Sequence, residues 1–350
     1  MPESMNKDYV LSIIKEIDHP RNSDLIQLIE NIYVSEQTVK IIVNSEFNKT
    51  VEDIAGLWQS LVKKDSKIKS CSVIFTKHNA PNLKRNMPPK NDPSLNKFDL
   101  SHLGKIIFIA SGKGGVGKST ISTNIATSIA EMGFKVGLMD ADIYGPSQPK
   151  MLGLDKSKVT ILDKKIQPQK IGNLSMMSMG MLFPEHEAII WRGPMLMKAI
   201  QQLLLEVAWG TQDYFIVDLP PGTGDIHITL AQKVLISGAI IISTPQDISL
   251  IDAKKAIALF SKTNTKIIGL IENMSYFECS NCGKKHDIFS NGGVKKITNS
   301  EKIPYLGSIP LIKEIMECAD KGTPYVSFMP EGRKLFGALV KNILKELNSY

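Results

Sequence analysis

Residues 106–120 of the chain read IIFIASGKGGVGKST. The first half is a short apolar run, which is typical of a buried strand. Gly112 begins the pattern G-x-x-x-x-G-K-[ST], which Lys118 and Ser119 complete. This motif requires a strand before the glycine-rich loop and a helix start after it, and the sequence supplies both. The stretch therefore predicts a P-loop, a backbone cradle for nucleotide phosphates.

The chemistry of the motif predicts ATP and Mg²⁺ as ligands. Glycines allow backbone N–H groups to turn toward phosphates, and the start of a helix favours negative charge. Lys118 is expected to reach the β- and γ-phosphates, and the Ser119 hydroxyl is expected to bind Mg²⁺. The predicted nucleotide-binding residues are Gly112, Lys113, Gly114, Gly115, Val116, Gly117, Lys118, Ser119 and Thr120.

Two acidic segments are expected beside this loop. Asp140 and Asp142 follow the apolar run of residues 136–139, and Asp218 ends the run of residues 214–218. Carboxylates at the ends of strands beside a P-loop can hold Mg²⁺ or its waters and can orient an attacking water. The glycines of LPPGTGD, residues 219–225, give the segment after Asp218 the freedom of a nucleotide-responsive switch.

The pattern around the P-loop predicts the fold class. Short apolar runs alternate with amphipathic helical stretches, which is typical of an α/β, doubly wound, mainly parallel sheet. Ligands of such sheets bind at the carboxyl ends of the strands, where the candidate motifs fall. The expected strands are residues 105–110, 135–140, 214–218, 238–243 and 266–272; the expected helices are 120–131, 194–208, 226–235 and 250–261.

A small α/β accessory domain is expected over residues 1–76. A helical pattern runs through Val10, Ile13, Ile14 and Ile17, and a second apolar set comprises Leu25, Leu28 and Ile29. Strands are expected at residues 31–34, 39–43 and 70–76, with a helix at 51–62. Residues 77–102 are rich in Pro and Asn and predict a linker. The ATPase domain then spans residues 103–350.

Composition limits the class of protein. Of the 350 residues, 43% are apolar and 22% are charged, which is typical of an ordinary globular chain. The net charge of +7 arises from Lys and Arg spread along the chain, so we expect no nucleic-acid partner. The longest apolar run, residues 234–243, is too short to cross a bilayer, and the first residues show no targeting pattern. We therefore expect a cytoplasmic protein without a membrane partner.

The chain has four cysteines, and Cys279 and Cys282 form a C-x-x-C pair. Two thiolates can chelate a soft metal centre, but a closed site requires four ligands. Three completions remain open. Two subunits could share one [4Fe–4S] cluster, His286 and another side chain could close a zinc knuckle, or the pair could be a redox dithiol.

Lys113 makes the loop K-G-G-V-G-K-S-T, which resembles the deviant P-loop of the MinD/ParA/nitrogenase-iron-protein superfamily. The resemblance implies a homodimer with ATP at the subunit contact, where Lys113 acts on the partner's nucleotide. It also implies that Asp142 positions the attacking water and that Asp140 and Asp218 belong to the magnesium shell. Asn273, in IENMS, resembles the asparagine that reads the adenine base.

The segments DADIYGPS, DLPPGTGD and ENMSYFECSNCGKKHDIF resemble those of Mrp/ApbC-type iron–sulfur cluster carriers over residues 103–345. The resemblance implies a [4Fe–4S] cluster bridged between subunits by Cys279 and Cys282, transfer to apo-proteins and slow ATP hydrolysis. A ParA-like positioning ATPase and a reductase like the nitrogenase iron protein are the alternatives. The C-x-x-C pair disfavours the first alternative, but it does not separate a carrier from a reductase.

Residues 1–76 resemble a SufT-like accessory domain in size and order of elements. That domain usually carries a cysteine before its second long helix, whereas residues 44–49 here contain none, which favours a docking or vestigial role. Three further features are interpreted as structural. Cys318 is expected to be a core thiol, and the Met-rich residues 174–181 are expected in the core or an interface. The amphipathic residues 333–347 are expected to pack on the sheet.

Overall fold

The computed structural model describes residues 7–20, 22–35, 38–44, 49–65, 68–76, 97–143, 145–182 and 193–349. The chain divides into two compact units, residues 1–90 and 91–350. The elements of the first unit are α1 (Lys7–Lys15), α2 (Asn22–Gln27), β1 (Ile29–Ser35), β2 (Thr38–Asn44), α3 (Lys49–Val62) and β3 (Ser70–Thr76).

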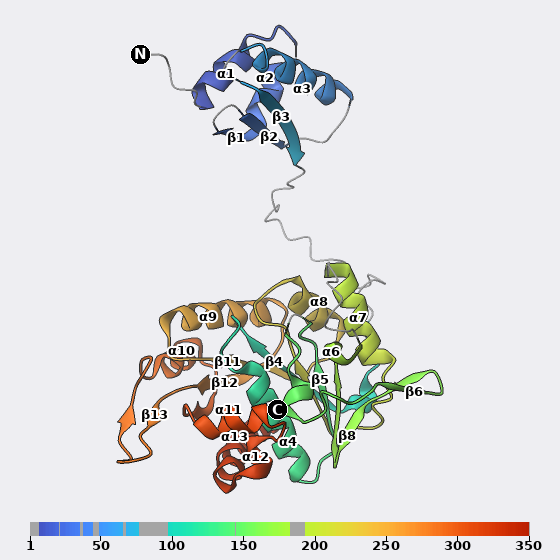
Figure 1. The fold of residues 1–350 in the computed structure, drawn as a ribbon, viewed down its shortest axis with the longest axis vertical. Coiled ribbons are helices and arrows are strands. Elements are labelled where there is room, and N and C mark those ends of the chain that lie inside the picture. Colours follow the sequence, from blue (N-terminus) through green and yellow to red (C-terminus); the bar gives the residue numbers. More distant parts are fainter. Residues whose placement is uncertain are drawn as a thin grey trace. The chain divides into compact units, whose positions relative to one another are not determined.

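The second unit contains the larger set of elements (Figure 1). Its strands are β4 (Lys105–Ser111), β5 (Val136–Asp140), β6 (Thr160–Leu162), β7 (Lys165–Gln167), β8 (Gln169–Ile171), β9 (Leu174–Ser178), β10 (Tyr214–Asp218), β11 (Gly238–Ser243), β12 (Ile267–Asn273), β13 (Phe277–Glu278), β14 (Lys285–His286) and β15 (Tyr305–Ile309). Its helices are α4 (Lys118–Glu131), α5 (Gln148–Met151), α6 (Met179–Leu182), α7 (Gly193–Leu205), α8 (Asp225–Lys233), α9 (Asp247–Lys262), α10 (Gly293–Glu301), α11 (Lys313–Asp320), α12 (Tyr325–Phe328) and α13 (Pro330–Asn348), with a 3₁₀ turn at Ser101–Leu103.

The central sheet has eight strands in the order β15-β12-β11-β4-β10-β5-β9-β8. Neighbouring strands are parallel except for β8, which pairs antiparallel with β9. Central strand β4 is buried on both faces, with Ile106 and Phe108 in one core and Ile107 and Ile109 in the other. Burial on both faces explains why the parallel strands read as continuous apolar runs. The predicted α/β, doubly wound and mainly parallel sheet is confirmed.

Helices cover both faces of this sheet (Figure 1). Helices α7 to α10 supply apolar side chains to one core, and α4, α11, α12 and α13 supply them to the other. The predicted packing of the amphipathic C-terminal stretch is confirmed, because α13 buries Phe336, Leu339 and Ile343 there. Cys318 is buried in the same core, as expected for a structural thiol. The Met-rich stretch is also core, since Met176 and Met177 are fully buried in β9.

The first unit is a three-stranded sheet in which β1 pairs antiparallel with β2 and β2 pairs parallel with β3. Its core contains Trp58, whose indole N–H donates to Asn22 Oδ1 at 2.7 Å. Helix α2 ends at Gln27, so Leu28 lies beyond the helix, and Ile29 belongs to β1. The apolar set of Leu25, Leu28 and Ile29 therefore does not lie on one helix, because the chain passes from α2 into β1 within it. Of the cysteine-free stretch 44–49, residues 45–48 lie outside the described residues.

Most of the predicted linker, residues 77–96, lies outside the described residues. Its last part packs on the second unit. The N–H of Phe98 donates to Lys233 O at 2.9 Å, and Leu100 and Leu103 are buried in the core beneath α7 and α8. The predicted linker was therefore too long at its end. Its composition resembles that of a linker, but residues 97–102 are held by the sheet domain.

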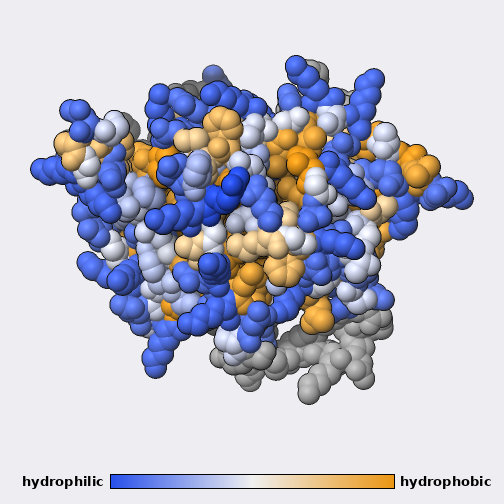
Figure 2. All heavy atoms as spheres, turned by 90° about the horizontal axis from the view of Figure 1, so that it is seen from below, coloured by the Kyte–Doolittle hydropathy of each residue, from blue (hydrophilic) through white to orange (hydrophobic). Residues whose placement is uncertain are grey.

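Figure 2 shows one face of the molecule, where hydrophilic residues predominate and apolar residues form separate patches. Two exposed apolar side chains, Ile161 and Leu162, belong to the short β6–β7 hairpin. None of the helices built from the described residues is long and apolar enough to span a membrane.

Candidate functional site

The P-loop connects β4 to α4, as predicted. Gly115 and Gly117 adopt positive φ angles of 80° and 81°, which side chains other than glycine rarely tolerate. A Cβ at Gly117 would lie 2.3 Å from Asn273 Nδ2, and one at Gly112 would lie 2.2 Å from the backbone of Asp252. No described side chain caps the start of α4, so its first N–H groups are left to other acceptors. This geometry fits a phosphate group.

Lys118, Asp218 and Asp140 meet beneath this loop. Asp140 and Asp218 end the neighbouring parallel strands β5 and β10 and are paired in register. The Lys118 ammonium lies 2.6 Å from Asp218 Oδ1, which also accepts from the Ser122 hydroxyl at 3.0 Å. Both members of the ion pair are buried, with 6% and 0% of their side chains exposed. The structure thus places the predicted magnesium-shell carboxylates together.

The Asp140 carboxylate accepts from the Asp142 N–H at 3.1 Å and from the Ser178 hydroxyl at 2.9 Å. Burial, followed by the negative charge of Asp218, raises the pKa of Asp140 to about 7. Two buried carboxylates, when ionised, carry more negative charge than the single lysine beside them can balance. This electrostatic arrangement fits a divalent cation held near Ser119.

Among the described residues, no group of three or more His, Cys, Asp or Glu side chains could hold a metal by itself. A magnesium ion at this position would therefore depend on the Ser119 hydroxyl, on phosphate oxygens and on water. That ligand set is ordinary for Mg²⁺, which keeps several waters and binds substrate phosphates.

Gln148 is a site residue that sequence reasoning missed. It begins the short helix α5 and is fully buried. Its Nε2 donates to Asp218 Oδ2 at 2.9 Å and to Ser119 O at 3.0 Å, and its backbone N–H donates to Asp140 Oδ2 at 3.3 Å. Gln148 therefore links the P-loop helix to both acidic strand ends. No motif marks it, since its partners come from three separate segments.

The two remaining predicted catalytic residues are Asp142, which follows β5, and Lys113, which lies within the P-loop. Asp142 is buried, and its Oδ1 accepts from the Gly145 N–H at 3.3 Å. Lys113 is half-buried, and its ammonium donates to Gln246 Oε1, before α9, at 3.4 Å. The Ser111 hydroxyl donates to Lys113 O at 2.9 Å and fixes the start of the loop.

Asn273 ends β12 beside the P-loop. Its Nδ2 donates to Val116 O at 2.8 Å, so the amide that was expected to read adenine also holds the loop backbone. A cavity of about 300 Å³ begins at Gly117 and Asn273 and continues along Pro310 and Leu311. Its apolar walls suit a flat heterocyclic ring adjacent to the phosphate cradle.

The segment after Asp218 turns at Gly222, whose φ is 97° and whose N–H donates to Ser111 O at 3.0 Å. His227, the third residue of α8, is buried, and its Nε2 lies 3.0 Å from Pro220 O. Because a carbonyl only accepts, this ring nitrogen donates. Burial lowers the pKa of His227. The neutral histidine therefore ties the candidate switch segment to its own helix.

Cys279 and Cys282 lie in the turn of the β13–β14 hairpin. The Gly283 N–H donates to Cys279 O at 2.8 Å, and the φ of Gly283 is 68°, which closes a tight knuckle. Cys282 is exposed and Cys279 is half-buried. N–H groups of Asn281 and Cys282 donate to the Cys279 sulfur and lower its pKa, which favours the metal-binding thiolate.

His286 lies opposite Phe277 in the same hairpin and is exposed. The two cysteines and His286 all belong to the described residues, and they do not form a group of three potential ligands. The hairpin by itself therefore presents two thiols. Cys71 is buried in β3 of the other unit, so it belongs to that unit's core.

Comparison with known proteins identifies the family to which the chain belongs. A family model described as the ParA-class NUBPL iron-transfer P-loop NTPase matches residues 102–347. An iron–sulfur cluster carrier protein of Aquifex aeolicus is 38% identical over 341 residues, which is 94% of each chain. The chain belongs to the family of iron-transfer P-loop NTPases that includes the iron–sulfur cluster carrier proteins.

Solved structures agree with this assignment. A nucleotide-binding protein of Archaeoglobus fulgidus, solved in complex with ADP, is 37% identical and has a TM-score of 0.59. The match covers 68% of this chain and 93% of that one. The cell division ATPase MinD of Pyrococcus furiosus has a TM-score of 0.50 at 21% identity, over 69% of this chain and 99% of that one, and shares the fold. The predicted resemblance to the carrier family is confirmed, and the likeness to MinD is one of fold.

Proposed function

We propose that this chain is an ATP-dependent carrier that holds a [4Fe–4S] cluster between two copies of itself and transfers it to apo-proteins. The observation that carries the proposal is the cysteine hairpin. It presents two thiols, one exposed and one with a lowered pKa, on a domain that also has a P-loop. The cluster is the cargo, and nucleotide turnover serves its loading and release.

The ligand count supports a shared cluster. A [4Fe–4S] cluster is held by four thiolates, and Cys279 and Cys282 provide two per chain. Two hairpins facing one another supply the full set. A bridged cluster is released when the two chains separate, which suits delivery rather than permanent storage.

The nucleotide site supplies the control. Lys118 and the N–H groups of the P-loop bind the phosphates of ATP, and Asn273 with the adjacent cavity receives the adenine. Bound Mg²⁺, held near Ser119, Asp140 and Asp218, would neutralise phosphate charge. Asp142 orients the attacking water, and slow hydrolysis resets the cycle. Binding of an anionic phosphate requires Lys118 to share its charge between Asp218 and the ligand.

Lys113 connects the nucleotide to the dimer. We propose that its ammonium leaves Gln246 and contacts the nucleotide of the partner subunit. In this scheme ATP draws the two chains together, and the distance between the two hairpins follows the state of the nucleotide. Acceptors are apo iron–sulfur proteins, and the carrier acts in the cytoplasm.

Three variants test the cluster assignment. Cys279→Ala and Cys282→Ala each leave two thiolates of four in a dimer, so both should abolish the brown chromophore after anaerobic reconstitution. His286→Ala is the discriminating variant, because a bridged cluster does not use the imidazole. It should retain wild-type iron content, and Cys318→Ala serves as a matched control in which a buried thiol is removed. Loss of metal in His286→Ala, with zinc bound to the wild type, would replace the carrier model with a zinc knuckle.

A further inference from the structure

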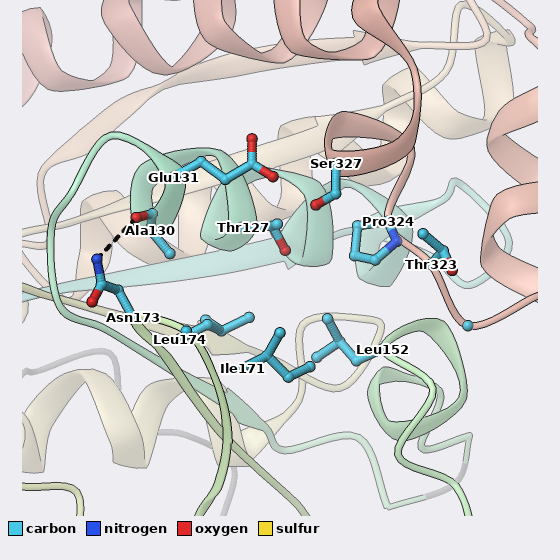
Figure 3. A pocket seen from close by; sticks show the side chains of 12 residues that line it. Thr127, Ala130, Glu131, Leu152, Ile171, Asn173, Leu174, Thr323, Pro324 and Ser327 are labelled. Atoms are coloured by element: carbon cyan, nitrogen blue, oxygen red, sulfur yellow. Dashed lines mark hydrogen bonds between the residues drawn. The ribbon is translucent and has the colours of Figure 1, made fainter.

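A second cavity, of about 600 Å³, lies at the opposite end of α4 from Lys118. It is lined by the last turns of α4, the segment after α5, the β8–β9 turn and the segment that joins α11 to α12 (Figure 3). This volume is within the range of small-molecule sites in proteins. The lining residues belong neither to the candidate nucleotide site nor to the cysteine hairpin.

One buried polar group beside this cavity has no partner among the described residues. Thr127 is 7% exposed, and its hydroxyl has no hydrogen-bond partner among the described residues. Ser122 and Thr123, in the same helix, donate to the carbonyl oxygens four residues earlier, at 3.0 and 2.9 Å. Thr127 does not make this local bond. Figure 3 shows its hydroxyl directed into the space between Leu152 and Ile171.

The walls determine what kind of molecule fits. Leu152, Ile171 and Leu174 present aliphatic side chains to the cavity. The neutral polar side chains of Asn173, Thr323 and Ser327 also line it. The charged lining residue, Glu131, is engaged outside it, since Arg333 Nε lies 3.6 Å from Glu131 Oε2. Because Glu131 and Arg333 already pair with each other, neither offers a counter-charge to an ion inside the cavity. A neutral ligand is therefore favoured.

We propose that this cavity binds a neutral, mostly apolar small molecule that carries one hydroxyl or carbonyl group. The apolar part is buried against the three aliphatic side chains. The ligand displaces the aliphatic side chains that cover the Thr127 hydroxyl, and its polar group then pairs with that hydroxyl, which can donate or accept. Such ligands satisfy a buried hydroxyl that otherwise lacks a partner.

Benzyl alcohol and toluene test this proposal, because they share an aromatic body and differ by one hydroxyl. Titrations are followed by NMR of the methyl groups of Leu152, Ile171 and Leu174 in the full chain. We expect benzyl alcohol to shift these resonances with a dissociation constant on the order of 1 mM, as is ordinary for so small a ligand. Thr127→Val should weaken benzyl alcohol binding roughly 5- to 10-fold and leave toluene binding unchanged or tighter.

Two further variants make the result specific. Thr229→Val removes a hydroxyl that is bonded to Asp225 O at 2.8 Å on α8, away from the cavity, and should change neither titration. Ser327→Leu places an aliphatic side chain in the cavity and should abolish the shifts from both probes. The proposal is overturned if the three methyl groups do not respond to benzyl alcohol. It is equally overturned if Thr127→Val binds both probes as the wild type does, or if the shifts persist in Ser327→Leu.

Discussion

Lys118 and Asp218 form a buried ion pair of 2.6 Å across 100 residues of sequence. The lysine begins the P-loop helix, and the aspartate ends β10, one strand away from the loop. Because the Asp218 carboxylate also accepts from Ser122 and Gln148, its position is fixed by three donors. The pair therefore holds Lys118, the proposed phosphate-binding lysine, beside the strand end that carries the proposed magnesium shell.

Lys118→Ala should abolish ATP binding, because the phosphates lose their main cationic partner. We expect a loss of affinity of roughly 100-fold or more, measured by isothermal titration calorimetry with Mg²⁺-ATP. Lys255→Ala is the control, since it removes a lysine from an exposed ion pair with Asp252 of 2.9 Å. Circular dichroism establishes that both variants are folded. Wild-type affinity in folded Lys118→Ala would refute the assignment of the P-loop.

Lys113→Ala should separate binding from hydrolysis. Its proposed role lies across the dimer, so the nucleotide affinity of a single chain should change only a few-fold while the steady-state ATPase rate falls by roughly 10-fold or more. Mixing Lys113→Ala with Asp142→Ala, which should be inactive because it lacks the proposed water-positioning carboxylate, offers a complementation test. Recovery of activity in the mixture supports action on the partner's nucleotide, whereas equal loss of binding and turnover in Lys113→Ala argues against it.

The loss of folding stability at acidic pH should depend in part on His227. Its folded-state pKa lies below the ordinary 6.5, so between these two values the unfolded chain binds a proton that the folded chain does not. Stability is therefore lost as pH falls through 6.5, by at most about 1.4 kcal/mol per pH unit from this group.

Urea unfolding of wild type and His227→Gln between pH 5 and pH 8 measures this effect, since glutamine keeps an N–H that can donate to Pro220 O. The difference in unfolding free energy between the two proteins should shift in favour of the variant as pH falls. A pH-independent difference would mean that His227 titrates equally in both states.

The sequence predicted the central strands because they are buried on both faces and read as uninterrupted apolar runs. Residues 214–218 and 238–243 match β10 and β11 residue for residue. The β6–β7 hairpin and the end of the sheet at β15 were not predicted. Their strands are short and partly exposed, so neither alternation nor a continuous apolar run marks them.

The residues of the candidate site were likewise predicted only in part. Lys118, Asp140 and Asp218 were found because each belongs to a motif at a strand end. Gln148 was missed because its importance arises from tertiary proximity to Ser119 and Asp218, 29 and 70 residues away. The bond from Asn273 to the loop backbone likewise could not be predicted, because it is a contact across 157 residues.

The domain boundary is tested by truncation. A chain that begins at Lys97 retains Phe98 and Leu100, which pack on the second unit, and should fold cooperatively and bind ATP. A chain that begins at Leu103 loses these contacts and should be less stable by roughly 1.5–3 kcal/mol for the buried side chain of Leu100, with a further loss from the partly buried Phe98. Insolubility of the longer truncated chain would show that residues 1–76 are not a separable domain.

The most direct test of the proposed function is a native mass measurement of the anaerobically reconstituted protein, combined with iron and sulfide analysis. We expect two chains that together carry about four iron and four sulfide atoms, with that inorganic mass lost in Cys282→Ala. Transfer of the cluster to an apo-acceptor should then leave the carrier free of iron. A wild-type monomer that holds one zinc and no sulfide would contradict the proposed function.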